Sequence, residues 1–105
     1  MEEHNTKDIG GNMKKSVIYD CMDNCIVCGS PYVEIHHIFY GNANRKISDK
    51  YGYVVPLCRE HHTGSTGIHS DRAFDIEIKK DAQKHFEVHF GPRNEFIRVF
   101  GKSYL

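Results

Sequence analysis

Two short cysteine and histidine motifs constrain this chain more than any other feature. The first is Cys25-x2-Cys28, and the second, Cys58-x2-His61, lies well downstream. A spacing of two residues lets both side chains of one tight turn reach the same ion, and structural zinc is held by four such ligands. The sequence therefore predicts a structural zinc site, which we call the clasp. The alternative is that the cysteines are buried apolar residues, and Cys21 competes only weakly because its spacing to Cys25 is x3.

A bound structural metal would add stability that a chain of this size needs. With 105 residues, the chain is expected to form one domain that buries only about 60 to 65% of its unfolded surface. Zinc binding in finger peptides is worth about 10 to 16 kcal/mol, which is comparable to the stability of a small domain. We therefore expect metal loss to unfold the protein. The 39% hydrophobic and 27% charged residues fit an ordinary globular chain.

Composition also bears on location and partners. No apolar run approaches the roughly 20 residues of a membrane span, and none near the N-terminus resembles a signal peptide. We expect a cytoplasmic protein without a membrane partner, in which four reduced cysteines favour metal binding over disulfides. The formal net charge is zero, so a DNA-facing surface would have to come from local clustering of basic residues.

The chain divides into a tail and one domain. Residues 1–15 are polar and lack periodicity, which predicts a mobile tail, and residues 16–105 form the domain. Residues 32–40 and 53–57 are rich in β-branched and aromatic side chains, so both predict strands. The polar stretch 41–52 between them predicts a long loop with a short helical turn near its end.

From Asp71 onward the pattern is helical. A mostly helical stripe contains Phe74, Ile76, Ile78, Ala82, Phe86 and Val88, with Lys79, Lys80 and Lys84 placed outside it. Ser70 or Asp71 is expected to cap this helix, and Gly91-Pro92 to end it. A shorter helix over residues 95–100 is expected to stop at Gly101. The fold class predicted is α+β.

Four histidines outside the clasp suggest a second site. His36 and His37 are adjacent in the first strand, so their side chains point to opposite faces unless the strand ends or bulges there. One imidazole can then hold an ion while its neighbour, with an ordinary pKa near 6.5, accepts a proton. His62 directly follows the clasp, and His69 precedes the long helix. Each histidine alone is as compatible with packing or the surface, but together they favour a metal site with a base beside it.

Two segments carry a resemblance to a known family. The runs Glu34-Ile-His-His-Ile38 and Leu57-Cys-Arg-Glu-His-His62 resemble the HNH nucleases, over roughly half the chain from Cys25 onward. The run from His37 to Lys46, with Gly67-Ile-His69, further resembles small HNH proteins of bacteriophages and prophages. A more distant similarity is to the phage nuclease that acts with a recombinase filament. The resemblance implies a zinc-stabilised ββα-metal (HNH) fold, here with an additional C-terminal helix, acting in a bacterial host cell.

The resemblance also implies a role for each inner histidine. His37 would be the general base, His36 and His62 would ligate a catalytic ion, and His69 would be the third ligand. The chemistry implied is metal-dependent hydrolysis of a phosphodiester by an endonuclease, in which a water attacks phosphorus and the ion stabilises the leaving oxygen. Magnesium, manganese, nickel and zinc are all compatible with the imidazole count.

The chain departs from the family pattern in two places. Tyr53 falls where the family has its middle asparagine, which braces the loop that orients the base. Asn42 or Asn44 are the alternatives for this brace. The gap from His62 to His69 is longer than in the shorter family members and contains glycines.

Several readings follow for function and partners. The leading one is an endonuclease that nicks DNA in phage or prophage DNA metabolism or recombination, with phosphate contacts from Arg45, Lys46, Arg59 and Arg72. The alternatives are a zinc-stabilised DNA- or protein-binding module without turnover, favoured by Tyr53 and zero net charge, and a purely structural zinc protein. Weak intrinsic DNA affinity would favour recruitment by a recombination or phage packaging or replication protein. The pair His85 and His89 is expected to be solvent exposed and is assigned no role.

Overall fold

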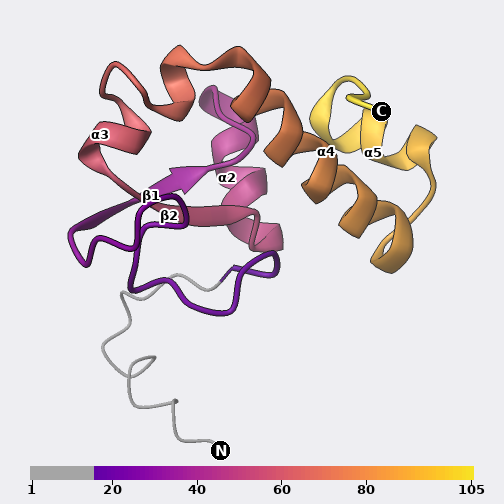
Figure 1. Cartoon of the computed structure of the whole chain (residues 1–105). Coiled ribbons are helices and arrows are strands. Elements are labelled where there is room, and N and C mark those ends of the chain that lie inside the picture. The colour runs from indigo at the N-terminus through magenta and orange to yellow at the C-terminus, as the bar shows by residue number, and fades with distance from the viewer. Residues whose placement is uncertain (1–15) are drawn as a thin grey trace, which may run out of the picture.

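The computed structural model describes residues 16–105 and shows a small α+β fold (Figure 1). Its elements are β1 (Val33–His37), α2 (Asn42–Tyr51), β2 (Val54–Cys58), α3 (Arg59–His62), the 3-10 helix η1 (Ile68–Ser70), α4 (Arg72–His89) and α5 (Arg93–Phe100). The predicted mobile tail, residues 1–15, lies outside the described part of the chain. Within residues 16–105, no helix has the length and apolar character needed to cross a membrane.

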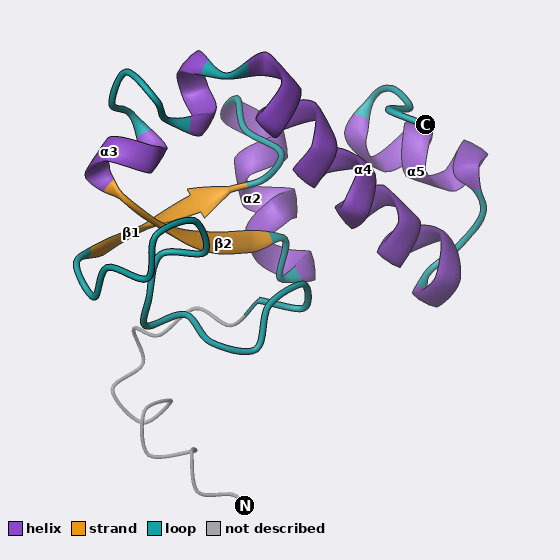
Figure 2. Ribbon diagram, viewed as in Figure 1, coloured by secondary structure: helices purple, strands orange, loops and turns teal. Residues whose placement is uncertain are grey.

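The two predicted strands form an antiparallel pair (Figure 2). In the register, His36 lies opposite Val55 and His37 opposite Val54. Every residue of β2 is buried. Because side chains alternate along a strand, Glu34 and His36 share one face of β1 while His37 belongs to the other. The sheet therefore separates the two adjacent histidines.

The prediction of a long loop over residues 41–52 is wrong, because most of this stretch forms α2. Gly41 precedes the helix with φ of 97°, and Gly52 ends it in the left-handed region with φ of 80°, a conformation that glycine adopts without steric cost. Ile47 and Tyr51, one turn apart, pack against the core. The stretch looks polar because only this narrow side of the helix faces the core.

An aromatic cluster joins the C-terminal helices to the sheet region. Phe39, just after β1, has its ring centroid 4.3 Å from that of Phe100 and 5.5 Å from that of Phe96. Phe96 in turn lies 5.3 Å from Phe86 of α4. The short helix α5 packs against both α4 and α2, and Gly101 ends it with φ of 102°. These contacts place α4 and α5 as the cover of one side of the fold.

The helical stripe in α4 was predicted with two errors. The helix begins where expected, because the Asp71 carboxylate accepts a hydrogen bond from the Phe74 N–H at 3.0 Å. However, Val88 is 77% exposed, whereas Lys79, placed outside the stripe, is only 7% exposed. Lys79 can be buried because its ammonium group donates to the carboxylate of Asp75, one turn earlier, at 2.9 Å. A charge pattern alone does not reveal such a pair.

Candidate functional site

The four clasp residues converge as predicted. Cys25 and Cys28 lie in the turn before β1, Cys58 ends β2 and His61 lies in α3. The Sγ atoms of Cys28 and Cys58 are 3.8 Å apart, and His61 Nδ1 lies 3.2 Å from Cys58 Sγ and 3.8 Å from Cys25 Sγ. Ligands around a tetrahedral zinc ion are separated by about 3.8 Å for two sulfurs and about 3.6 Å for sulfur and nitrogen. The cluster could therefore hold a zinc ion with little rearrangement.

The environment of the clasp favours thiolate at Cys25. Burial raises the pKa of the Cys25 thiol, but hydrogen bonds from backbone N–H groups, including those of Cys58 and Cys28, outweigh burial and bring the pKa to about 6. The turn itself is fixed to the sheet, because Ile26 N–H donates to the carbonyl of Pro56 at 3.1 Å. The protein thus presents a deprotonated sulfur, which is the form that binds metal.

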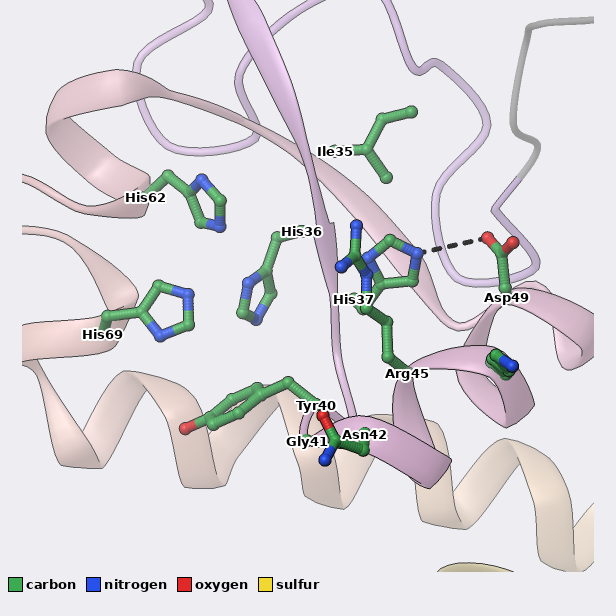
Figure 3. A pocket seen from close by; sticks show the side chains of 11 residues that line it. Ile35, His36, His37, Tyr40, Gly41, Asn42, Arg45, Asp49, His62 and His69 are labelled. Atoms are coloured by element: carbon green, nitrogen blue, oxygen red, sulfur yellow. Dashed lines mark hydrogen bonds and ion pairs between the residues drawn. The ribbon is translucent and has the colours of Figure 1, made fainter.

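A second cluster forms from His36, His62 and His69, which we call the trihistidine cluster. One ring nitrogen from each lies within 4.8 Å of the others, and the three ring centroids are 4.9 to 5.2 Å apart. Figure 3 shows the three imidazoles gathered on one side of β1. They come from β1, α3 and η1, so the cluster exists only once the chain has folded.

His36 is the most informative member of this cluster. Its side chain is 1% exposed, and its Nε2 atom has no hydrogen-bond partner. Burial, with additional repulsion from His62 and His69, lowers the pKa of His36 to about 3. The imidazole is therefore neutral and offers a lone pair in a buried position, which is what a metal ligand requires. A divalent ion fits this donor set and would give the orphaned nitrogen a partner.

Glu34 supports the trihistidine cluster, although the sequence motif that contains it assigned it no role of its own. Its carboxylate accepts a hydrogen bond from Nδ1 of His62 at 2.8 Å, which leaves Nε2 of His62 as the ring nitrogen that could bind a metal. This bond also holds the pKa of Glu34 below its ordinary value. Metal-ligating histidines commonly donate their second ring N–H to a carboxylate in this way. Strand alternation could have found Glu34, because it lies two residues before His36.

The glycine-containing connection between α3 and η1 brings His69 to the cluster. Glu60 accepts hydrogen bonds from the backbone N–H and the hydroxyl of Thr66, at 3.0 and 2.6 Å, which folds the connection back onto α3. A Cβ atom on Gly67 would lie 2.6 Å from the carbonyl oxygen of His62. Only glycine permits this approach, so the longer gap is a packed turn that delivers the third histidine.

His37 lies on the other side of β1, as strand alternation predicts (Figure 3). Its Nε2 atom is 3.2 Å from a carboxylate oxygen of Asp49 in α2. Because a carboxylate only accepts hydrogen bonds, the contact favours the tautomer with the proton on Nε2 and the lone pair on Nδ1. Asp49 was missed at the sequence level because the stretch that contains it was predicted as loop.

Ser48 performs the bracing that was expected of an asparagine. Its buried hydroxyl accepts from the backbone N–H of Phe39 at 3.3 Å and donates to the carbonyl of Tyr53 at 2.5 Å. That carbonyl also accepts from the N–H of Ile38 at 2.9 Å. The backbone directly after His37 is thus tied to α2 and to the start of β2.

The two asparagines proposed for that role lie elsewhere. Asn44 donates to the carbonyl of Phe100 at 3.1 Å and so ties α2 to α5. Asn42 lines the cavity described below. The Tyr53 side chain is buried in the core, where its hydroxyl meets Nδ1 of His85 at 3.0 Å. His85 is therefore half-buried and bonded, contrary to its expected exposure, while its neighbour His89 is exposed.

One cavity of about 860 Å³ connects these groups. Its lining includes all three trihistidine residues together with His37 and Asp49, and, from the first turns of α2, Asn42, Arg45 and Lys46. Of the four basic residues predicted to contact phosphate, Arg45 and Lys46 thus lie at the cavity. Arg59 instead pairs with Glu34, with 3.5 Å between Nε and the carboxylate, and Arg72 is not part of the lining.

Comparison with protein-family models, with curated proteins and with solved structures found no match for this chain.

Proposed function

We propose that this protein is a metal-dependent endonuclease of the HNH type, which nicks DNA by hydrolysing a phosphodiester. The observation that carries the proposal is the shared cavity, in which a base held by a carboxylate stands beside three clustered imidazoles and two basic side chains. The antiparallel strands followed by α3 and η1, with the clasp at their end, are compatible with a ββα-metal arrangement. In that scheme α5 is the additional C-terminal helix.

His36, His62 and His69 would hold one divalent ion. Three imidazoles and no carboxylate among the ligands favour borderline ions such as zinc, nickel or cobalt over magnesium, which prefers oxygen ligands. When bound, such an ion supplies positive charge that stabilises the phosphorane and the leaving oxygen. The clasp, with three thiolates, would hold zinc and serve folding rather than chemistry.

His37 would act as the general base. In the proposed step, Nδ1 of His37 takes a proton from water while the water oxygen forms a bond to phosphorus. The bond from phosphorus to the 3′-oxygen breaks, and that oxygen takes a proton from solvent. Asp49 keeps the proton on Nε2 and holds the ring, while Ser48 fixes the backbone that carries it. Arg45 would orient the phosphate in the cavity.

A DNA- or protein-binding module without turnover is the second candidate, and the zero net charge favours it. The same lack of basic excess would make a nuclease depend on a recombination or phage packaging or replication partner for DNA affinity. The two candidates differ in what they require of His37. A binding module has no need of an oriented base, so it tolerates replacement of this residue.

Cleavage of supercoiled plasmid tests the proposal. Wild type, His37→Ala and the control His89→Ala would be assayed with nickel, cobalt, zinc, manganese and magnesium, after circular dichroism and zinc analysis show that each is folded and clasp-loaded. We expect metal-dependent nicking by wild type and His89→Ala, and loss of nicking in His37→Ala. Equal nicking by all three proteins would remove His37 from the mechanism. No nicking by wild type with any metal, on supercoiled or single-stranded DNA, would favour the binding module.

A further inference from the structure

Two buried side-chain polar atoms within residues 16–105 have no hydrogen-bond partner, and both lie near the trihistidine cluster. One is Nε2 of His36, for which the proposed ion gives an explanation. The other is Oδ1 of Asp75, in the first turn of α4. Asp75 is only 8% exposed, and a buried carboxylate oxygen without a donor is destabilising. The proposed cleavage step does not use Asp75, so its burial needs another reason.

A chain of contacts joins Asp75 to the trihistidine cluster. Its second oxygen accepts from the buried ammonium of Lys79 at 2.9 Å. That ammonium lies over the ring of Tyr40, 4.3 Å from its centroid. The Tyr40 ring in turn lies edge-on to the ring of His69, with 5.1 Å between centroids. Asp75 and Lys79 thus form an ion pair beside the cluster, behind one of the cavity walls.

The position of His69 agrees with this arrangement. It lies in η1, which packs on α4 shortly before Asp75. The Asp75 carboxylate and the His69 ring lie near enough to interact electrostatically. Asp75 itself is not one of the ligands, because its oxygens are not among the atoms that lie within 4.8 Å of one another. The carboxylate is therefore close to the ligand set but outside it.

We propose that Asp75 is a positioning residue of the trihistidine site, whose unpartnered Oδ1 accepts a hydrogen bond from the non-ligating ring N–H of His69 when an ion is bound. Glu34 already makes the corresponding contact to His62, so each of these two ligands would have its own carboxylate. Lys79 holds Asp75 in place through their ion pair. The inference rests on the metal site of the proposed function but requires no cleavage.

Equilibrium binding of cobalt to the zinc-loaded protein tests this inference, read by calorimetry and by the visible absorption of the bound ion. We expect Asp75→Asn to weaken cobalt binding by about tenfold or more, as is usual when the carboxylate behind a ligating histidine is lost. The matched control is Asp81→Asn, an exposed carboxylate on the same helix, which is expected to bind as wild type. Wild-type affinity in Asp75→Asn overturns the proposal. Absence of cobalt binding in wild type would instead count against the proposed metal site.

A double variant separates positioning from simple ion pairing. Asp75→Asn leaves Lys79 buried without its partner, so the variant can lose affinity through misfolding alone. Asp75→Asn/Lys79→Met removes that unpaired charge. Our proposal expects the double variant to regain stability in thermal unfolding while its cobalt affinity stays reduced. Recovery of wild-type affinity in the double variant would show that Asp75 serves only Lys79, and the proposal would be overturned.

Discussion

Replacing Gly67 with alanine is expected to damage the trihistidine cluster without removing any ligand. The φ of Gly67 is −83°, a value that alanine adopts freely, so backbone conformation is not the obstacle. The obstacle is space, since the new Cβ would lie 2.6 Å from the carbonyl oxygen of His62 and 2.8 Å from that of Glu60. Both neighbours are backbone atoms of α3 and cannot rotate away.

The structure sets the size of both expected effects. Ordinary van der Waals contact begins at 3.4 Å, so the connection must move by roughly 0.8 Å, the difference between 3.4 and 2.6 Å. Overpacking lowers the free energy of unfolding by about 1 to 3 kcal/mol. Alanine also reduces the entropy of the unfolded chain, which offsets about 0.4 to 1 kcal/mol of that loss. Metal-ligand distances tolerate only about 0.2 Å. A displacement of His69 by this amount should therefore lower metal affinity by about tenfold or more.

The assay is cobalt binding to zinc-loaded protein, with thermal unfolding measured on the same samples. Gly91→Ala is the control, because its Cβ would meet no backbone atom within 4 Å among its nearest contacts, but the side chain of Glu95 at 3.2 Å and the ring of Phe86 at 4.0 Å. We expect Gly67→Ala, but not Gly91→Ala, to lose affinity, and His69→Ala to add little to the loss in a Gly67→Ala background. Wild-type affinity in Gly67→Ala, or full additivity of the two substitutions, would refute the claim that Gly67 acts by placing His69.

Four further outcomes are expected. Removing zinc from the clasp with a chelator should unfold the protein, and circular dichroism that keeps its native signal in metal-free protein would contradict this. Ser48→Ala should cost about 1 to 3 kcal/mol in denaturant unfolding, because the buried N–H of Phe39 loses its acceptor. Glu34→Gln should weaken cobalt binding about 10- to 100-fold with the clasp unaffected, and an unchanged affinity would remove Glu34 from the support of His62. When the trihistidine cluster holds no ion, the pKa of His36 in the folded protein is about 3. In the unfolded chain, His36 instead takes up a proton below about pH 6.5, so acid favours unfolding. Stability should then fall by about 1 kcal/mol between pH 7 and 5.5, and a His36→Asn variant with the same pH slope would contradict this.

The parts of the site that depend on covalent spacing could be predicted from the sequence. The x2 spacings place two ligands on each turn of the clasp, and strand alternation separates His36 from His37. Both consequences hold whatever the remainder of the fold does. The same alternation would have assigned Glu34, because it is a matter of counting two residues along β1.

The supporting residues could not be predicted because they depend on tertiary packing. The stretch that forms α2 has few apolar residues, so its sequence predicts a loop and gives no reason to assign Ser48 or Asp49 a role. Asp75 was overlooked for a related reason. The sequence predicts Lys79 on the solvent side, because a lysine is buried only with a charged partner. That partner is Asp75, one turn earlier, and the sequence does not show that Asp75 is itself buried. Each omission concerns a polar group whose role comes from burial.

The adjacent residues His61 and His62 belong to different clusters, because neighbours on a helix such as α3 point about 100° apart. A single short helix therefore faces a thiolate-rich donor set on one side and an all-imidazole set on the other. In a cell that supplies several metals at once, these two sets would rank the ions differently, with the sulfur set retaining zinc most strongly. If both clusters took zinc, scarcity would empty the trihistidine cluster first, and the clasp, on which the fold depends, would be the last to lose its ion.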